Sequence, residues 1–359
     1  MIDVLKKWYR RYLSEEESVL LLVLVVAALA ILMSVGDVLS PVFVAVVLAY
    51  LMQGVANQLT AWGLSSRVGV WISTLLFTGV FFGFLLGLLP LVWRQLISLA
   101  KEAPAMVESG RQALSVLPAQ YPALVSHEQL NVVMGNIQTE LAQFGQVVVT
   151  KGLSSIPSLL AIMVYMVLIP LMVFFFLKDR ERIVSWVVSF LPHQRPLLSG
   201  IWAEMNQQFA NYARGKVIEI SIVGGVSYLC FALLGLNYAA LLALLVGLSV
   251  IIPYIGATLV TIPVVVVAYF QWGIGPDFYW VVVAYGIIQV LDGNVLVPLL
   301  FSEAVNLHPV AIIVAVLFFG GVWGVWGVFF AIPLATLVNA IVGAWPTAAD
   351  ALSSTPSGD

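Results

Sequence analysis

Long apolar runs separated by short polar segments dominate the pattern of this chain. The runs cover residues 19–35, 39–52, 68–92, 156–177, 217–236, 240–272, 279–300 and 310–342. Most of them reach about 20 residues, the length at which a helix crosses the roughly 30 Å hydrocarbon core of a bilayer. The shorter alternating segments that are typical of outer-membrane barrels do not recur. The pattern therefore predicts an all-α, polytopic helical membrane protein with about eight hydrophobic segments.

The composition agrees with this fold class. Hydrophobic residues make up 62% of the chain and charged residues 9%, whereas soluble domains have roughly 25% charged residues. The single cysteine, Cys230, lies inside an apolar run. One cysteine provides neither an intrachain disulfide nor a thiolate metal site, so we expect a small core residue there.

The distribution of basic residues predicts the orientation. By the positive-inside rule, we expect the N-terminus to be cytoplasmic. No small-residue cleavage site follows the first apolar run, so we expect that run to be a retained anchor. The long helical runs predict a multi-pass protein of a bacterial inner (plasma) membrane. The side assigned to the cytoplasm carries Lys6, Lys7, Arg10, Arg11, Arg67, Lys178, Arg180, Arg182, Arg195, Arg214 and Lys216. The opposite side carries Arg94, Lys101, Arg111 and Lys151.

Five regions follow from the runs and charges. Residues 1–93 are predicted to hold N-terminal transmembrane helices, and residues 94–154 a small soluble extracytoplasmic insert of amphipathic helices. Residues 155–216 combine a transmembrane helix with cytoplasmic amphipathic helices, the last of which, 196–216, is expected along the inner membrane interface. Residues 217–345 form the expected transport core, and 346–359 a polar tail.

Two runs of the core are too long for one simple crossing. The first, 240–272, is broken at Pro253 and Gly256, and the second, 310–342, is interrupted by several glycines. If each run is a hairpin that enters and leaves by one face, the pair forms the inverted repeat of alternating-access carriers. Two kinked crossing helices fit the same pattern.

One carboxylate of the core stands out. Beyond Lys216 there is no lysine or arginine, and a carboxylate at membrane depth costs about 2.5 to 3.5 kcal/mol on insertion scales. We expect Glu219 and Glu303 to lie near the cytoplasmic boundary in water, and Asp292 to lie deepest.

Asp292 and Asn294, with carbonyls freed around Pro253 and Pro298, are therefore candidate ligands for Na⁺ or a proton, because hard cations bind oxygen. The alternative role for Asp292 is to cap a helix that begins near Val295.

Further polar residues near the break are candidate hydrogen-bonding groups for a polar solute. They are Ser249, Tyr254, Thr258, Gln289 and His308. Each fits packing or capping equally, and His308 before Pro309 fits either a helix cap or a proton sensor.

Several strings resemble those of the autoinducer-2 exporter (AI-2E) family, also called the PerM permease family. They are residues 176–182, 252–256, 289–298 and 307–309, and the glycine-rich run that ends at 332–333. Residues 212–219 are similar to the PerM branch in particular. Many relatives have Gly-Gln at the position where this chain has Gly215-Lys216. The resemblance implies permeases with roughly eight hydrophobic segments that form homo-oligomers, with pentamers as one form. Some members are linked to export of the signalling molecule autoinducer-2, others to exchange of sodium or lithium for protons.

Together these features predict a secondary-active transporter that exports a small polar solute, coupled to H⁺ or Na⁺ as in an antiporter. Its partners are the solute or ion, the lipid bilayer and further copies of the chain, with no nucleic acid and no cofactor. The alternative is a membrane scaffold of the cell envelope or division machinery. An enzyme is disfavoured, because the sequence has no His-Glu-x-x-His motif, no Gly-x-Ser-x-Gly motif and no phosphate-binding loop. The charged string at 178–182 is interpreted as an orientation anchor rather than a phosphate site.

Overall fold

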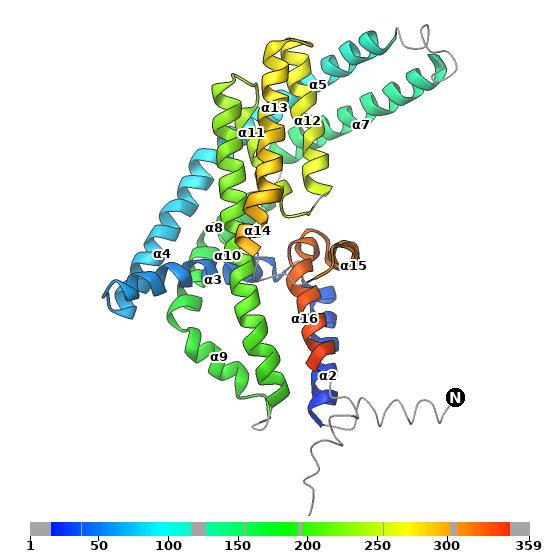
Figure 1. Cartoon of the computed structure of the whole chain (residues 1–359). Helices are drawn as coiled ribbons and strands as arrows, with labels where there is room; N and C mark the ends of the chain where they lie inside the picture. The colour runs from blue at the N-terminus through cyan, green and yellow to red at the C-terminus, as the bar shows by residue number, and fades with distance from the viewer. Residues whose placement is uncertain are drawn as a thin grey trace, which may run out of the picture.

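The computed structural model describes residues 16–36, 38–115, 127–153, 156–192, 196–253, 255–301 and 307–344 (Figure 1). Every regular element in these residues is a helix. Six of the described helices are long and apolar enough to cross a membrane, and four shorter apolar helices accompany them. The prediction of a polytopic helical membrane protein is therefore confirmed.

The N-terminal part consists of α2 (Glu16–Val35), α3 (Ser40–Ala61) and α4 (Ser66–Gly83). The apolar run that ends at residue 52 is shorter than the helix that contains it, because α3 continues through polar residues to Ala61. The turn to α4 is confined to residues 62–65, where the Ser65 side chain accepts a hydrogen bond of 3.4 Å from the Val68 N–H and caps α4.

The next helix is continuous across the predicted start of the insert at residue 94. After α4 come a π-helical turn, η1 (Phe84–Leu88), and α5 (Leu89–Leu114), which continues the same rod. Helix α7 (His127–Leu153) packs antiparallel to α5, and both project from the rest of the molecule (Figure 1). Two hydrogen bonds join them: Arg111 to Asn131 at 3.2 Å and Gln138 to Glu108 at 3.3 Å.

One long helix organises the rest of the chain. Helix α8 (Ile156–Lys178) contains Pro170, and the short α9 (Arg180–Val188) follows it. Helix α10 then runs without interruption from Pro196 to Leu233 along the length of the molecule (Figure 1). The expected interfacial helix over 196–216 is therefore not a separate element. Its residues are the first half of a 38-residue helix.

Both long apolar runs fold back on themselves. The first forms α11 (Ala239–Ser249) and α12 (Ile255–Trp272), which pack together. At its turn, a Cβ on Gly256 would collide with the carbonyl oxygen of Ser249, so only glycine fits. Helix α11 also packs tightly on α10, where the Cα of Gly224 lies 3.0 Å from the place of a Cβ on Gly247.

The second run forms α15 (Pro309–Phe329) and α16 (Ala331–Ala344). Helix α15 is interrupted at Trp323 and at Gly324, whose φ of 59° is in the left-handed region that favours glycine. Beyond that interruption the chain reverses, and Ala331 packs on Ala315 and Val316 of the first arm. Both runs are thus hairpins rather than kinked crossing helices.

Between the hairpins, α13 (Pro276–Leu291) continues through a second π-helical turn, η2 (Asp292–Leu296), into α14 (Val297–Phe301). Both π-helical turns end two residues before a proline, Pro90 and Pro298. In a regular α-helix, a proline lacks the N–H for a backbone hydrogen bond, and its ring collides with the carbonyl group four residues earlier. The wider π-helical turn relieves this collision. The core cluster of buried residues joins α10, α11, α12 and α13, and this packing positions η2 beside the middle of α10.

Candidate functional site

A cavity of about 600 Å³ lies where the two hairpin turns meet the middle of α10. Its walls come from α10, the turn of the first hairpin, the end of α13 with η2 and α14, and both arms of the second hairpin. Its lining residues are Tyr212, Lys216, Glu219, Val250, Ile252, Pro253, Ala257, Gln289, Asp292, Gly293, Val297, Pro298, Phe301, Leu307, Pro309, Ile312 and Ile332.

A buried ion pair lies on the α10 wall of this cavity. The ammonium group of Lys216 is 2.7 Å from a carboxylate oxygen of Glu219, one helical turn further along. The Lys216 residue is 4% exposed and Glu219 1%. The expectation that Glu219 lies in water near the cytoplasmic boundary was therefore wrong. Since α10 does not end at Lys216, both residues lie deep between packed helices.

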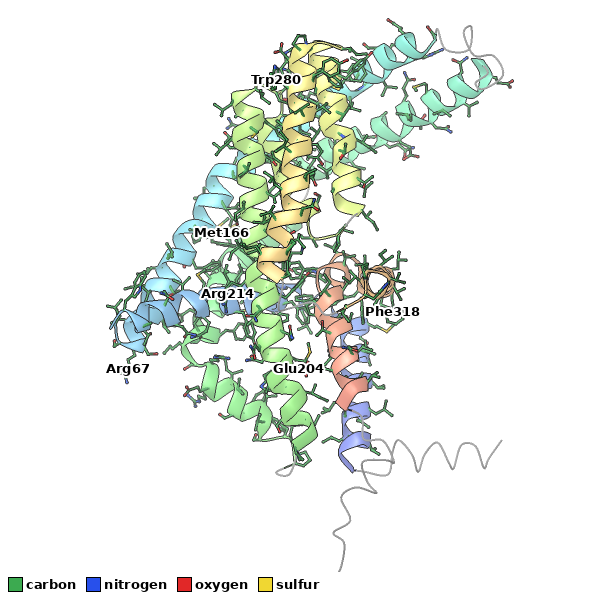
Figure 2. The ribbon with its side chains drawn as sticks, in the orientation of Figure 1. Arg67, Met166, Glu204, Arg214, Trp280 and Phe318 are labelled. Atoms are coloured by element: carbon green, nitrogen blue, oxygen red, sulfur yellow. The ribbon has the colours of Figure 1, made fainter. Side chains whose placement is uncertain are left out.

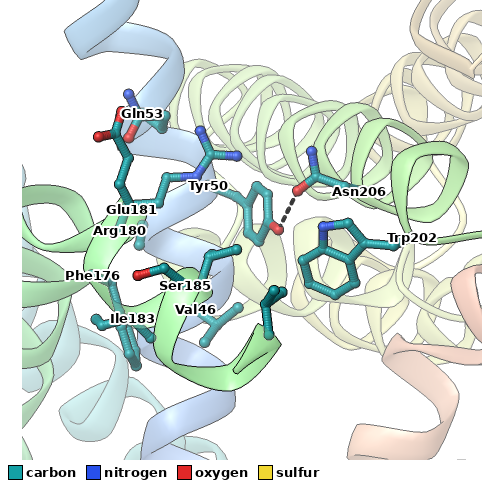
Figure 3. Close-up of a pocket in the computed structure, with 13 residues that line it drawn as sticks. Val46, Tyr50, Gln53, Phe176, Arg180, Glu181, Ile183, Ser185, Trp202 and Asn206 are labelled. Atoms are coloured by element: carbon teal, nitrogen blue, oxygen red, sulfur yellow. Dashed lines mark hydrogen bonds between the residues drawn. The ribbon is translucent and has the colours of Figure 1, made fainter. Parts of the chain in front are cut away.

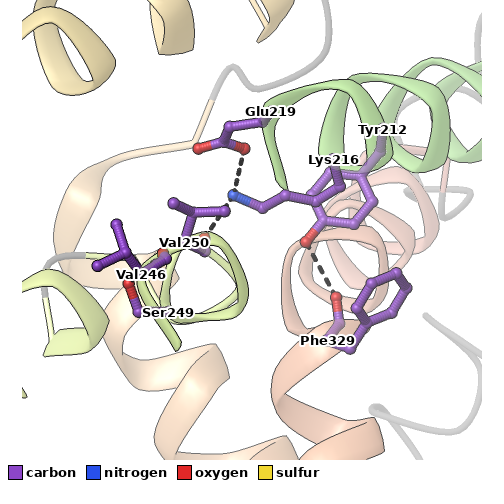
Figure 4. A network of polar contacts seen from close by, with 7 residues as sticks. All are labelled: Tyr212, Lys216, Glu219, Val246, Ser249, Val250 and Phe329. Carbon is purple, nitrogen blue, oxygen red and sulfur yellow. Dashed lines mark hydrogen bonds and ion pairs between the residues drawn. The ribbon is translucent and has the colours of Figure 1, made fainter. Parts of the chain in front are cut away.

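Lys216 also binds the first hairpin. Its ammonium group donates a second hydrogen bond of 2.7 Å to the carbonyl oxygen of Val250 (Figure 4). Helix α11 ends at Ser249, so this carbonyl lies just beyond the helix. The ring centroid of Phe301 lies 5.2 Å from the same ammonium group, within range of a cation–π interaction. Gly215 allows this approach, because a Cβ there would lie 2.8 Å from the Phe301 ring.

Tyr212, one turn before Lys216, binds the second hairpin. Its hydroxyl donates a 2.9 Å hydrogen bond to the carbonyl oxygen of Phe329 (Figure 4). Four residues beyond Phe329 stands Pro333, which has no N–H to donate, so this carbonyl lacks its helical partner. One face of α10 therefore contacts the turns of both hairpins.

Asp292 completes the cavity opposite Lys216. The two residues line the same space and interact electrostatically. The expectation that Asp292 lacks a cationic neighbour was therefore wrong, since Lys216 reaches it from α10. Helix α13 also continues through Asp292 into η2 and α14, so Asp292 is not the N-cap of a helix that begins near Val295.

Two polar atoms of this wall are buried and have no hydrogen-bond partner among the described protein groups. They are Oδ1 of Asp292 and Nε2 of Gln289. Buried polar atoms are almost always satisfied, so such a pair marks a place for a further polar species. No cluster of three or more His, Cys, Asp or Glu side chains occurs in the part of the chain that the structure describes.

The remaining predicted site residues are divided between this cavity and other places. Pro253 lines the cavity, and Gly256 forms the hairpin turn beside it. Ser249 is buried, and its hydroxyl donates to the Val246 carbonyl within α11. Thr258 lines a neighbouring hollow that shares Gln289 with the cavity.

Two others, Asn294 and His308, do not line the cavity. Asn294 is exposed, and its amide donates a 2.9 Å hydrogen bond to the Val290 carbonyl. His308 is exposed and caps α15, its Nδ1 accepting a 3.2 Å hydrogen bond from the Val310 N–H. Tyr254 lies outside the described residues, as do Glu303 and the predicted polar tail.

The charges of the cavity decide what it can do chemically. Two carboxylates, Glu219 and Asp292, face one ammonium group. When all three are ionised, the site carries one net negative charge in a low-dielectric environment, which favours a cation or a proton over an anion. The arrangement is typical of ion binding rather than of nucleophilic catalysis.

Comparison with known proteins identifies the family of this chain. Residues 20–347 match the sequence model described as AI-2E family transporter. The chain belongs to this AI-2E family. It is 48% identical over 346 residues to the protein named "Putative permease PerM" of Escherichia coli (strain K12), covering 96% of this chain and 98% of that protein.

A more distant relative is named "Putative transport protein YrrI", from Bacillus subtilis (strain 168). It is 25% identical over 306 residues, with 84% of this chain and 85% of the relative covered. The chain is thus a multi-pass membrane protein of a transporter family.

Proposed function

We propose that this AI-2E protein is a secondary-active transporter that exports a small polar solute, such as a signalling molecule, in exchange for H⁺ or Na⁺. The observation that carries this proposal is the cavity in which Lys216, Glu219 and Asp292 meet between interrupted helices. Intramembrane ionisable residues that line a cavity are typical of ion and proton pathways.

In this proposal Asp292 binds the coupling ion. A sodium ion there would be bound by oxygen atoms, of which the Asp292 carboxylate is one and the Gln289 side-chain carbonyl another. A proton on Asp292 would remove the same net charge. Asn294 stabilises η2 through its bond to Val290 and thereby holds Asp292 at the cavity wall.

The two hairpins are the proposed gates. They are taken as re-entrant elements of an inverted repeat, with both turns near the middle of the membrane. The Lys216 bond holds the first hairpin to α10 and the Tyr212 bond holds the second. Release of one bond while the other remains would open the cavity to one side only, which is the requirement for alternating access.

We further propose that the N-terminus is cytoplasmic, that α5 and α7 extend on the opposite side as the soluble insert, and that the protein is a homo-oligomer, with a pentamer as one form. The basic residues of the described chain support the orientation. Arg67 and Glu204 lie toward one end of the molecule, and Trp280 lies at the other end (Figure 2).

Flux through proteoliposomes tests the function. Because Na⁺ and H⁺ would compete for Asp292 in this proposal, the purified protein should also exchange Na⁺ or Li⁺ for protons, which a pH-sensitive dye sealed in the vesicles would follow. Asp292→Asn should abolish the exchange, because the amide cannot take up a proton or neutralise a cation. Asp277→Asn is the matched control, since Asp277 is exposed on the same helix α13 and lies outside the cavity.

Retained exchange in Asp292→Asn, or equal loss in Asp277→Asn, would contradict the role of Asp292. If the wild-type protein showed neither ion exchange nor solute flux, the scaffold hypothesis would replace the transporter.

A further inference from the structure

A second pair of hollows lies at the end of the molecule that carries Arg67, away from the Asp292 cavity. The first, of about 480 Å³, lies between α3, α9 and α10. Its walls are mostly aliphatic and aromatic, with Tyr50 donating a 2.7 Å hydrogen bond to Asn206 across it (Figure 3). The lining residues are Val46, Ala49, Tyr50, Gln53, Phe176, Arg180, Glu181, Ile183, Val184, Ser185, Val188, Trp202 and Asn206.

The adjoining hollow is polar. It measures about 500 Å³, lies between α3, α4 and the α8–α9 junction, and shares Gln53, Arg180 and Glu181 with the first. Four basic side chains line it, Arg67, Lys178, Arg180 and Arg182, together with the two acidic residues Asp179 and Glu181. The ionised groups of this hollow therefore sum to two positive charges.

In the described part of the chain, none of the four basic side chains of the polar hollow forms an ion pair with an acidic side chain. Among the described residues, the ion pairs are those of Arg111 with Glu108 and of Lys216 with Glu219. Neither involves the residues of the polar hollow. Lys178 instead lies over the ring of Phe174, 5.5 Å from its centroid. Donors are thus available for an anionic ligand.

Exposed tryptophans place the hollows at the depth of lipid headgroups. Trp71 on the wall of the polar hollow is 57% exposed, as is Trp202 on the wall of the apolar one, and nearby Trp186 is 64% exposed. Tryptophan concentrates at the boundary between hydrocarbon and water. An apolar cleft that joins a basic cleft at this depth matches one kind of molecule, with an acyl chain on one end and a phosphate on the other.

We propose that these joined hollows bind an anionic phospholipid, with its phosphate in the basic hollow and an acyl chain in the apolar one. Arg67 and Arg182 bind the headgroup from α4 and α9, and Arg180 lies where the two hollows join. The charged string at 178–182 would then bind a lipid in addition to orienting the chain. Basic pockets between transmembrane helices bind such headgroups in other membrane proteins.

Native mass spectrometry of the purified full-length protein, titrated with lipids of defined headgroup, tests this proposal. Phosphatidylglycerol should bind more tightly than phosphatidylcholine with the same acyl chains. A basic residue near the membrane surface contributes about 1 kcal/mol, so Arg67→Gln combined with Arg182→Gln should weaken phosphatidylglycerol about 25-fold. Lys101→Gln combined with Arg111→Gln removes the same charge from exposed positions on α5 and should leave the affinity unchanged.

Two further measurements distinguish the binding of a lipid from the binding of a free phosphate. Glycerol 3-phosphate, which has the headgroup chemistry without chains, should bind far more weakly than phosphatidylglycerol. Ser185→Trp fills the apolar hollow and should weaken phosphatidylglycerol but leave glycerol 3-phosphate unaffected. Arg67→Lys combined with Arg182→Lys keeps the charge, so it should retain binding and show that the Gln variant does not fail through misfolding.

Equal binding of phosphatidylglycerol and phosphatidylcholine would overturn the proposal. Phosphatidylglycerol binding that is weakened equally in the α5 control would also overturn it, as would unchanged binding in the Arg67→Gln and Arg182→Gln double variant. Glycerol 3-phosphate that binds as tightly as the lipid would do the same. These results are independent of transport, because no residue of the Asp292 cavity is altered.

Discussion

Lys216 connects the polar residues of the cavity with the first hairpin, one of the two proposed gates. Its ammonium group contacts the Glu219 carboxylate, the Val250 carbonyl and the Phe301 ring, and it faces Asp292. Three of these four groups are negative or carry a negative dipole, and Glu219, Val250 and Phe301 are buried, whereas Asp292 is partly buried. Removal of this one cation therefore affects the charge of the cavity and the attachment of the first hairpin together.

The first prediction concerns the Lys216–Glu219 pair. Lys216→Met should destabilise the protein by about 3 to 5 kcal/mol, because Glu219 remains buried without its partner. The double variant Lys216→Met with Glu219→Leu should be more stable than Lys216→Met alone, since no charge is then stranded. Thermal unfolding of the detergent-solubilised protein, followed by tryptophan fluorescence, measures both.

Glu204→Gln is the control for this pair, because Glu204 is exposed on the same helix and should tolerate the change. A double variant that is less stable than the Lys216→Met single variant would show that the two residues do not act as a pair.

The second prediction separates two roles of His308. Its Nδ1 accepts from the Val310 N–H, so His308→Ala should lose about 1 kcal/mol of stability, whereas His308→Asn restores a capping oxygen. If His308 is only a cap, His308→Asn should transport with the pH profile of the wild type in the proteoliposome assay. A shifted pH profile in a stable His308→Asn protein would instead make His308 a proton sensor.

Sequence patterns could identify Asp292 and Gln289 because apolar runs make any polar residue conspicuous. They missed Lys216 and Glu219 for a physical reason. Polar residues at 196–216 suggested an interfacial helix that ends at Lys216, but no helix-breaking residue other than Gly215 stands there, and α10 continues to Leu233. The spacing of Tyr212, Lys216 and Glu219, at positions i, i+4 and i+7, was the available signal for one buried polar face.

At the scale of elements, the hairpin turns depend on glycines that allow backbone contact. The third prediction is that Gly256→Ala and Gly327→Ala are both strongly destabilising, because a Cβ at either position collides with a backbone carbonyl across the turn, that of Ser249 or Phe319. Gly286→Ala in α13 is the matched control. A Cβ there meets nothing within 4 Å, so this change should be neutral or stabilise by up to about 1 kcal/mol.

Protein yield and melting temperature in detergent distinguish these variants. A Gly256→Ala protein as stable as Gly286→Ala would show that the first hairpin turn is more open than the structure has it.

The fourth prediction concerns the bond between α10 and the second hairpin. Tyr212→Phe removes only the hydroxyl that donates to the Phe329 carbonyl, so it should lower stability by about 1 kcal/mol while leaving the ring contacts intact. In the proposed mechanism it should also alter the rate of ion exchange, because one of the two gates is released. Tyr228→Phe on the same helix, where the side chain is exposed, should change neither quantity.

Helix breaks were predictable from Pro253 and the glycines near 324. Whether the chain reverses or only bends at each break was not predictable. A broken apolar run fits both a hairpin and a kinked crossing, since hydrophobicity is the same in either arrangement. The close approach of Gly256 to Ser249 decides for the hairpin, and the hydrophobicity of the run contains no signal for this backbone contact. The glycines at 79, 83 and 87 show the converse. Their spacing is typical of helix packing, yet no neighbouring group in the described part of the chain lies within 4 Å of a Cβ built on them.

At the scale of the whole molecule, two hairpins from separate parts of the C-terminal half meet at one helix. Helices α11 and α12 lie in the upper half of the view, and α16 runs through the lower half (Figure 1). Their turns contact α10 one helical turn apart, at Lys216 and Tyr212. In the proposed mechanism, these two contacts are the ones that hold the gates closed.

The most direct test of this account is the accessibility of the cavity from each side of the membrane. A single cysteine at Ala257, which lines the cavity, is introduced together with Cys230→Ser and reconstituted in oriented vesicles. A membrane-impermeant thiol reagent should label it from either side, with the favoured side changing when Na⁺ or pH changes. A cysteine at exposed Asp277 should be labelled from one side under all conditions. Labelling of Ala257→Cys from one side only, whatever the ion conditions, would contradict alternating access at Asp292.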